Sequence, residues 1–108
     1  MREDDRIVQI ANHYGYEHQS NQLIEEMAEL TQAINKWWRK LTEMEKMRPV
    51  NPVEKTPTEL IDHIAEEIAD VGICLEQVEH LLGIECRVER YREKKLERQI
   101  RRMEGAER

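Results

Sequence analysis

The sequence predicts an all-α protein folded as a single domain over residues 1–108. Phe is absent and only four glycines are present, while Glu, Arg, Leu, Ile and Met are abundant, a composition typical of helices rather than of β-sheets. Apolar residues recur at intervals of three and four along most of the chain, which is the period of an amphipathic helix. Because so short a chain forms only a modest core, we expect a four-helix bundle that is completed by oligomerisation.

The first two helices are predicted on either side of Gly15. A short amphipathic stretch over residues 3–13 ends at NHYGY, where Gly15 suits a helix stop. A second helix starts near Glu17, and its apolar face is formed by Leu23, Met27, Leu30, Ile34 and one of the two tryptophans, Trp37 or Trp38.

The third helix has the clearest boundaries. All three prolines lie in the segment RPVNPVEKTP, residues 48–57, which predicts a loop. Thr56 is placed as an N-cap, with Pro57 at the first helical position and Glu59 completing a capping box. The longest apolar stripe of the chain follows and ends at Gly83. A fourth, strongly charged helix is predicted over the remaining residues, with a frayed end.

The spacing between the acidic motifs predicts a break in the second helix. If this helix ran unbroken to Met47, Glu29 would lie about 27 Å from its end, whereas Glu67 lies only about 15 Å from the start of the third helix. If the second helix instead ends near Arg39, Glu29 and Glu67 lie at similar distances from the connected ends of their helices. A break is therefore expected between Lys40 and Thr42. Residues 41–57 then form an excursion that covers the site or meets another subunit.

Charge and hydropathy limit the function classes. The net charge is −6, and the negative charge lies in the first 86 residues, so a general nucleic-acid-binding surface is not expected there. The chain has no apolar run near 18 residues, and from its highly charged first residues, MREDDRIVQ, we expect no signal peptide. We therefore expect a cytoplasmic protein without membrane contact, and we interpret Cys74 and Cys86 as reduced structural thiols.

Four carboxylates occur as two pairs with the same spacing. Glu26 and Glu29 are three residues apart in QLIEEMAEL, and Glu67 and Asp70 repeat this spacing in AEEIAD. Each pair lies about 100° around its helix from the apolar stripe, in the same rotational sense. Two helices packed along their stripes would bring the pairs together, where their repulsion requires a positive partner. Oxygen ligands alone suit Mg²⁺ or Mn²⁺, whereas either pair by itself is more readily explained as a solvated helix face.

The motifs EEMAEL and EEIAD resemble the EExxE and ExxD signature of the all-α nucleoside triphosphate pyrophosphohydrolases. This MazG-like superfamily also contains the dimeric dUTPases and the phosphoribosyl-ATP pyrophosphohydrolases. The resemblance extends from YGYEHQ to KLERQIRR. It implies magnesium-dependent hydrolysis of a (deoxy)nucleoside triphosphate to a nucleoside monophosphate and pyrophosphate, as nucleotide-pool housekeeping. Such amphipathic helices in a short chain also predict a homodimer or homotetramer.

The resemblance implies a role for each matching residue. Glu25 and Glu26 would be catalytic, Glu25 as a further metal ligand or as the group that orients the attacking water. The implied metal ligands are Glu26, Glu29, Glu67 and Asp70. The expected substrate contacts are Gln19, Gln22, Trp37, Lys95, Gln99 and Arg102, of which Trp37 is a candidate for base stacking or core packing.

The sequence departs from the family pattern at three points, and other functions stay open. Gln22 stands where a lysine is frequent, Gln99 stands where an asparagine is commoner, and the 37 residues between Glu29 and Glu67 exceed the usual interval. One alternative is a non-catalytic helical interaction module with solvated acidic faces. Another is a specialised pyrophosphohydrolase for dUTP, dCTP or a phosphoribosyl nucleotide.

Overall fold

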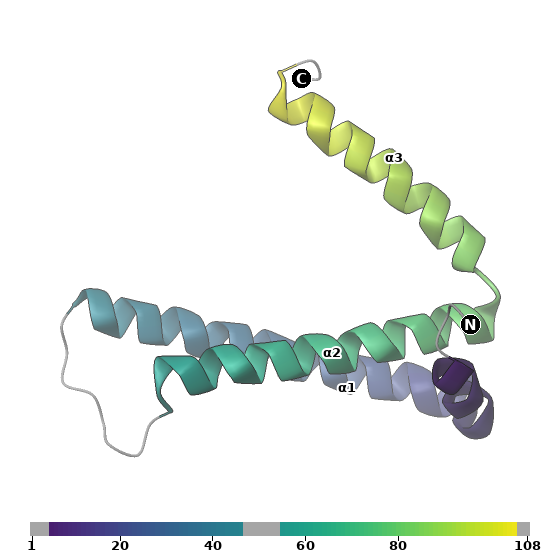
Figure 1. Ribbon diagram of the computed structural model, residues 1–108, viewed down its shortest axis with the longest axis horizontal. Helices are drawn as coiled ribbons and strands as arrows, with labels where there is room; N and C mark the ends of the chain where they lie inside the picture. The colour runs from purple at the N-terminus through teal and green to yellow at the C-terminus, as the bar shows by residue number, and fades with distance from the viewer. Residues whose placement is uncertain (1–4, 47–54, 106–108) are drawn as a thin grey trace.

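The computed structural model describes residues 5–46 and 55–105, and all regular structure in these ranges is helical. Helix α1 comprises Asp5–Glu45, α2 comprises Pro57–Leu82 and α3 comprises Glu85–Met103. α1 and α2 lie side by side as an antiparallel hairpin, and α3 turns away from it (Figure 1). The prediction of an all-α fold is confirmed.

A kink at Gly15 divides α1 into two helical segments. The backbone of Gly15 has φ 84° and ψ 171°, a conformation that is practically restricted to glycine because other residues would strain there. The helix predicted over residues 3–13 and the helix predicted from Glu17 are therefore consecutive segments of α1. Residues 3 and 4 of the first predicted helix lie outside the described residues.

The predicted break between Lys40 and Thr42 is wrong. α1 continues to Glu45, and the hydroxyl of Thr42 donates a hydrogen bond of 3.1 Å to the carbonyl of Trp38 instead of capping a new helix. No break is needed because α1 extends past the first turn of α2 (Figure 1). Of the predicted excursion over residues 41–57, its first five residues belong to α1, and residues 47–54 lie outside the described ranges.

The ends of α2 are those that the sequence predicts. The hydroxyl of Thr56 accepts a hydrogen bond of 3.2 Å from the backbone N–H of Glu59, and the Glu59 carboxylate accepts one of 3.1 Å from the N–H of Thr56. Pro57 occupies the first turn, where its missing N–H costs no helical hydrogen bond. Gly83 ends the helix in the left-handed conformation, with φ 65°.

The contact between α1 and α2 is lined mainly by small and polar side chains. On α1, Gln19, Ala33 and Lys40 are buried, and Glu26 completes a series of positions seven residues apart. A seven-residue repeat keeps one side of a helix against its neighbour over several turns. On α2 the buried side chains are Leu60, Glu67, Val71, Cys74 and Gln77. We call this contact the polar seam.

The expectation that these helices pack along their apolar stripes holds only in part. Val71 is buried, but Met27, Ile34, Ile68 and Leu75 are between 39% and 55% exposed. In the single chain, Glu67 is therefore more buried than most of the large apolar side chains of the two stripes. A substantial apolar surface on the hairpin stays open to solvent.

Helix α3 contributes little to the core of the described chain. It contacts α2 only weakly and makes no contact with α1, none of its residues is buried, and Tyr91, Leu96 and Ile100 are exposed. The described residues of one chain therefore form a hairpin with a projecting helix rather than a closed bundle. None of the described helices combines the length and apolar character that crossing a bilayer requires.

Candidate metal centre

The antiparallel register of α1 and α2 brings the two acidic motifs to the same level. Two hydrogen bonds across the helices show this register: Gln19 Nε2 donates to Gln77 Oε1 over 2.5 Å, and the His80 ring lies 3.0 Å from Asn12 Oδ1. Together these two hydrogen bonds fix the register of α1 against α2. Glu26 on α1 therefore meets the turn of α2 that carries Glu67 and Asp70.

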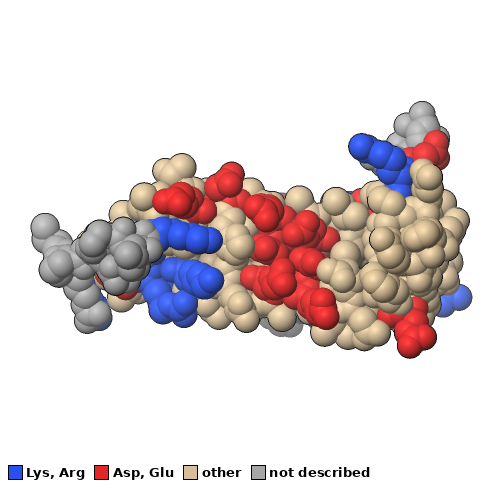
Figure 2. Space-filling view, turned by 90° about the horizontal axis from the view of Figure 1, so that it is seen from below, with Lys and Arg blue, Asp and Glu red and all other residues tan. Residues whose placement is uncertain are grey.

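Three carboxylates from the two helices converge at this level. Glu26, Glu67 and Asp70 each present one oxygen within 4.8 Å of the other two. Glu67 is buried, with 5% exposure, and the other two are half-buried. Glu29 is exposed, yet its charge raises the pKa of Glu67, so it belongs to the same electrostatic group. Figure 2 shows the resulting band of carboxylates across the hairpin. We call these four residues the carboxylate cluster.

Burial and the crowding of negative charge raise the pKa values of two of these groups. The pKa of Glu67 is raised first by its removal from water and then by the charges of Glu29, Asp70 and Glu26. The pKa of Asp70 is raised by burial, by the charge of Glu26 and by a hydrogen bond with Glu26. Both shifts favour protonation, which means that the cluster holds its full negative charge at an energetic cost unless a cation is bound.

The donor atoms of the cluster fit a hard divalent cation. Oε2 of Glu26 and Oε2 of Glu67 are buried and have no hydrogen-bond partner. Buried polar atoms without partners are costly, and a bound ion is one of the standard ways to satisfy them. Because every donor is a carboxylate oxygen, the set matches Mg²⁺ or Mn²⁺ rather than a thiolate- or imidazole-bound metal. Acidic groups also gather without any ion, so the orphaned oxygens carry this inference.

Neighbouring polar side chains orient the cluster. Gln22 Nε2 donates a hydrogen bond of 2.7 Å to Glu26 Oε1, one turn further along α1. The ring of His63 lies 3.9 Å from Glu67 Oε1, also at a spacing of one turn. Gln22 was expected to contact substrate, and here it holds a carboxylate.

Sequence reasoning missed the role of Gln77 and the position of Cys74. Gln77 is 1% exposed and pairs with the buried Gln19, one of the expected substrate contacts. This pair fixes the register of the two helices. Cys74 is buried beside the cluster, and its pKa is raised by burial and by the charges of Glu26 and Asp70. The seven-residue spacing between Glu67 and Cys74 in the sequence could have indicated that both lie on the same side of α2. Its protonated thiol agrees with the expected structural role.

Other predicted site residues lie apart from the cluster. Glu25 is exposed and lines a different surface hollow, with Tyr14 and His18 among its neighbours. Trp37 is half-buried whereas Trp38 is 63% exposed. Three of the expected substrate contacts are exposed on α3, which projects away from the hairpin (Figure 1): Lys95, Gln99 and Arg102.

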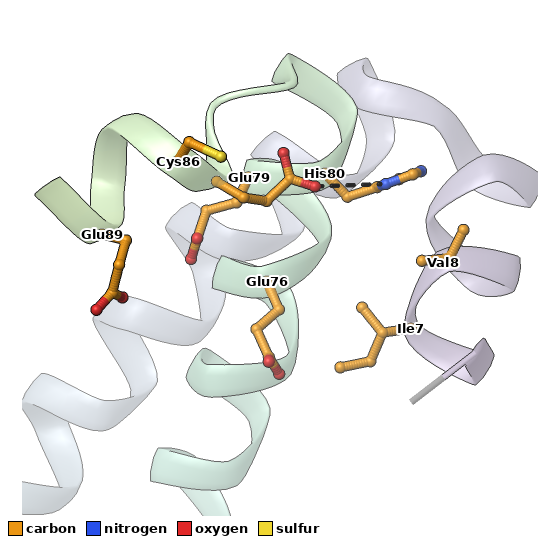
Figure 3. Close-up of a pocket in the computed structure, with 8 residues that line it drawn as sticks. Ile7, Val8, Glu76, Glu79, His80, Cys86 and Glu89 are labelled. Carbon is orange, nitrogen blue, oxygen red and sulfur yellow. Dashed lines mark ion pairs between the residues drawn. The ribbon is translucent and has the colours of Figure 1, made fainter. Parts of the chain in front are cut away.

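Besides the carboxylate cluster, acidic residues line a hollow at the corner between α2 and α3. It has a volume of about 340 Å³, and Figure 3 shows Glu76, Glu79 and Glu89 along it, with Ile7 from the start of α1 on another side. The ring of His80 lies 3.9 Å from the Glu85 carboxylate there. The described residues bring no three of its carboxylates as close together as in the carboxylate cluster. The hollow is therefore a weaker candidate for a metal ion.

Comparison of the chain with models of protein families, with curated proteins and with solved structures gives no match.

Proposed function

We propose that the protein is a magnesium-dependent nucleoside triphosphate pyrophosphohydrolase that releases a nucleoside monophosphate and pyrophosphate. The observation that carries the proposal is the convergence of Glu26, Glu67 and Asp70 across two helices, with oxygens within 4.8 Å of one another. These residues belong to the two motifs that resemble the MazG-like signature. The raised pKa values of Glu67 and Asp70 support it, because a cluster built to hold cations is strained without them.

In this proposal the residues of the carboxylate cluster bind the metal ion, and neighbouring side chains position the cluster and the attacking water. Glu26, Glu67 and Asp70 would hold Mg²⁺, or Mn²⁺ in its place, with Glu29 as the outer ligand. The bound cation would supply charge neutralisation at the reacting phosphate. Gln22 keeps Glu26 in position through its hydrogen bond of 2.7 Å. Glu25 adjoins Glu26 in the sequence but is exposed on another side of α1 in the single chain; in the assembled enzyme it would be a further metal ligand or the group that orients the attacking water.

The substrate contacts on α3 require a second copy of the chain. Lys95, Gln99 and Arg102 lie on a helix with no buried residue, and exposed apolar side chains accompany them. A homodimer or homotetramer that covers the apolar surfaces of the hairpin and of α3 would form the four-helix bundle and bring these side chains to a neighbour's cluster. The half-buried Trp37 would remain a candidate aromatic contact for the base.

The experiment is pyrophosphate release from a panel of ribo- and deoxynucleoside triphosphates with Mg²⁺. The parent protein is expected to hydrolyse at least one of them. Glu29→Gln and Asp70→Asn should lower kcat/KM by at least about 100-fold, since changes in the surroundings of metal ligands alone cost about 10- to 100-fold. Glu66→Gln is the matched control, because Glu66 is exposed on the same helix and has no role in the cluster. The substrate preferred from the panel would also show whether the enzyme is specialised for dUTP or dCTP.

One observation favours a second candidate, a helical interaction module. The apolar side chains Tyr91, Leu96 and Ile100 on α3 are exposed beside many charged residues, as on a helix that docks with a partner. A module of this kind hydrolyses no nucleotide, and Mg²⁺ with nucleotide does not change its melting temperature. An enzyme gains stability from both ligands because they bind only the folded state.

A further inference from the structure

A basic pocket lies at the end of the hairpin where α1 finishes and α2 begins. Six residues line it: Lys36, Arg39, Lys40, Glu43, Lys55 and Leu60. Four of them are cations and one is an anion. Figure 2 shows lysine and arginine side chains gathered beside the band of carboxylates on the same face of the hairpin. A local excess of positive charge therefore stands out on a chain whose net charge is −6.

The pocket differs from an ordinary group of surface lysines. Lys40 is 5% exposed and its Nζ is buried, so an ammonium group has been withdrawn from water at the pocket wall. Leu60, 7% exposed, adds an apolar surface beside it. Interactions of a charged donor strengthen where water is excluded. An anion that enters the pocket thus meets three exposed cations, and the buried charge of Lys40 adds to the positive potential there.

The size and the donors of the pocket indicate the class of ligand. Its volume of about 300 Å³ is at the lower end of the range for small-molecule sites, so it suits a small anion rather than a whole nucleotide. Arg39 offers a planar fork for two oxygens of a phosphate, and Lys36 and Lys55 offer point charges. We propose that this pocket is a binding site for a small phosphate anion, of which pyrophosphate is the best match in charge.

The position of the pocket relates it to the carboxylate cluster. Lys36 lies seven residues after Glu29 on α1, which places it on the same face about 10 Å along the helix. The pocket needs no metal and does not depend on hydrolysis at the cluster. If the proposed function is correct, and only then, the anion is the outer part of the substrate or the pyrophosphate that leaves it.

The test is calorimetric titration of the parent protein with pyrophosphate in the presence of EDTA. EDTA removes divalent cations, so a failure of the metal site cannot affect the result. Binding is expected in the parent, and Lys36→Gln/Arg39→Gln should weaken it by at least about tenfold, since two charge-assisted hydrogen bonds are lost. Both side chains are exposed, so the double variant should retain the parent's melting temperature.

The matched control is Arg90→Gln/Lys94→Gln, which makes the same change of charge at exposed positions of α3. It should bind pyrophosphate as the parent does. A parent that binds no pyrophosphate, or two double variants that weaken binding equally, would overturn the proposal. A second titration with a nucleoside triphosphate in EDTA identifies the source of the phosphate. Equal affinities for the two ligands indicate a site for the free anion, and tighter binding of the nucleotide indicates a site for its outer phosphates.

Discussion

Replacing Asp70 by asparagine tests whether the carboxylate cluster is strained without a cation. The side chains have nearly the same shape, so the substitution removes one negative charge with little change in packing. The introduced amide would also be able to donate a hydrogen bond to Glu26, which two carboxyl groups achieve only by sharing a proton. We expect Asp70→Asn to be more stable than the parent at pH 7 in EDTA.

The separation between the carboxylate oxygens of Asp70 and Glu26 determines how much stability Asp70→Asn should gain. The oxygens of Asp70 and Glu26 lie within 4.8 Å of each other, and two unit charges at that upper limit repel by about 0.9 kcal/mol in water and by about 3.5 kcal/mol at an effective dielectric constant of 20. Asp70 is half-buried, so its repulsion with Glu26 lies between these limits, at about 1–2 kcal/mol. For a chain of this length, that difference corresponds to an increase in melting temperature of about 4–10 °C.

The assay is thermal unfolding of parent and variant, with and without Mg²⁺, over a range of pH. In EDTA the variant should melt higher; with Mg²⁺ the parent should gain stability and the variant should gain less. Asp62→Asn is the control, because Asp62 is exposed on the same helix. If Asp70→Asn melts at or below the parent in EDTA at pH 7, the carboxylates are not strained and the argument is wrong.

The sign of the pH dependence follows from the raised pKa of Asp70. Its ordinary value is 3.8, and in the folded protein it is higher, so the folded state binds the proton more tightly than the unfolded state. The associated stability is present below the ordinary pKa and is lost as pH rises through the raised one. The difference in melting temperature between Asp70→Asn and the parent should therefore narrow as the pH falls through that interval.

Two further predictions concern the backbone and the polar seam. Gly15→Ala should lower the free energy of unfolding by about 1–3 kcal/mol, because φ 84° is strained for alanine; Gly72→Ala, in the interior of α2 and also with open space at its Cβ, should instead raise it by up to about 1 kcal/mol. Chemical denaturation measures the change in the free energy of unfolding of each variant, and changes of the same sign in the two variants would contradict the account of the kink at Gly15. Gln77→Leu should cost about 1–3 kcal/mol by leaving the buried amide of Gln19 without its partner, and Gln19→Leu/Gln77→Leu should recover most of that loss; a double variant less stable than the single one would contradict the pairing.

Local chemistry explains why some boundaries were predictable. Thr56, Glu59 and Gly83 define the ends of α2 through contacts within a few residues, and such contacts can be recognised from neighbouring letters of the sequence. Gly15 likewise marks the kink of α1. The predicted break at Lys40 failed because it was inferred from the levels of two distant motifs, and the offset between the helix ends compensates for the difference (Figure 1).

The sequence by itself determined the helical character of this protein, the limits of α2 and the placement of Glu67 and Asp70 on one side of that helix, because periodicity and capping act over one or two helical turns. Only the tertiary structure decided that the helices meet along the polar seam, that Gln19 and Gln77 lock their register, and that Lys36, Arg39, Lys40 and Lys55 share a pocket. Those features depend on which side of each helix is buried. An amphipathic pattern leaves that rotation open when polar and apolar faces both compete for the contact.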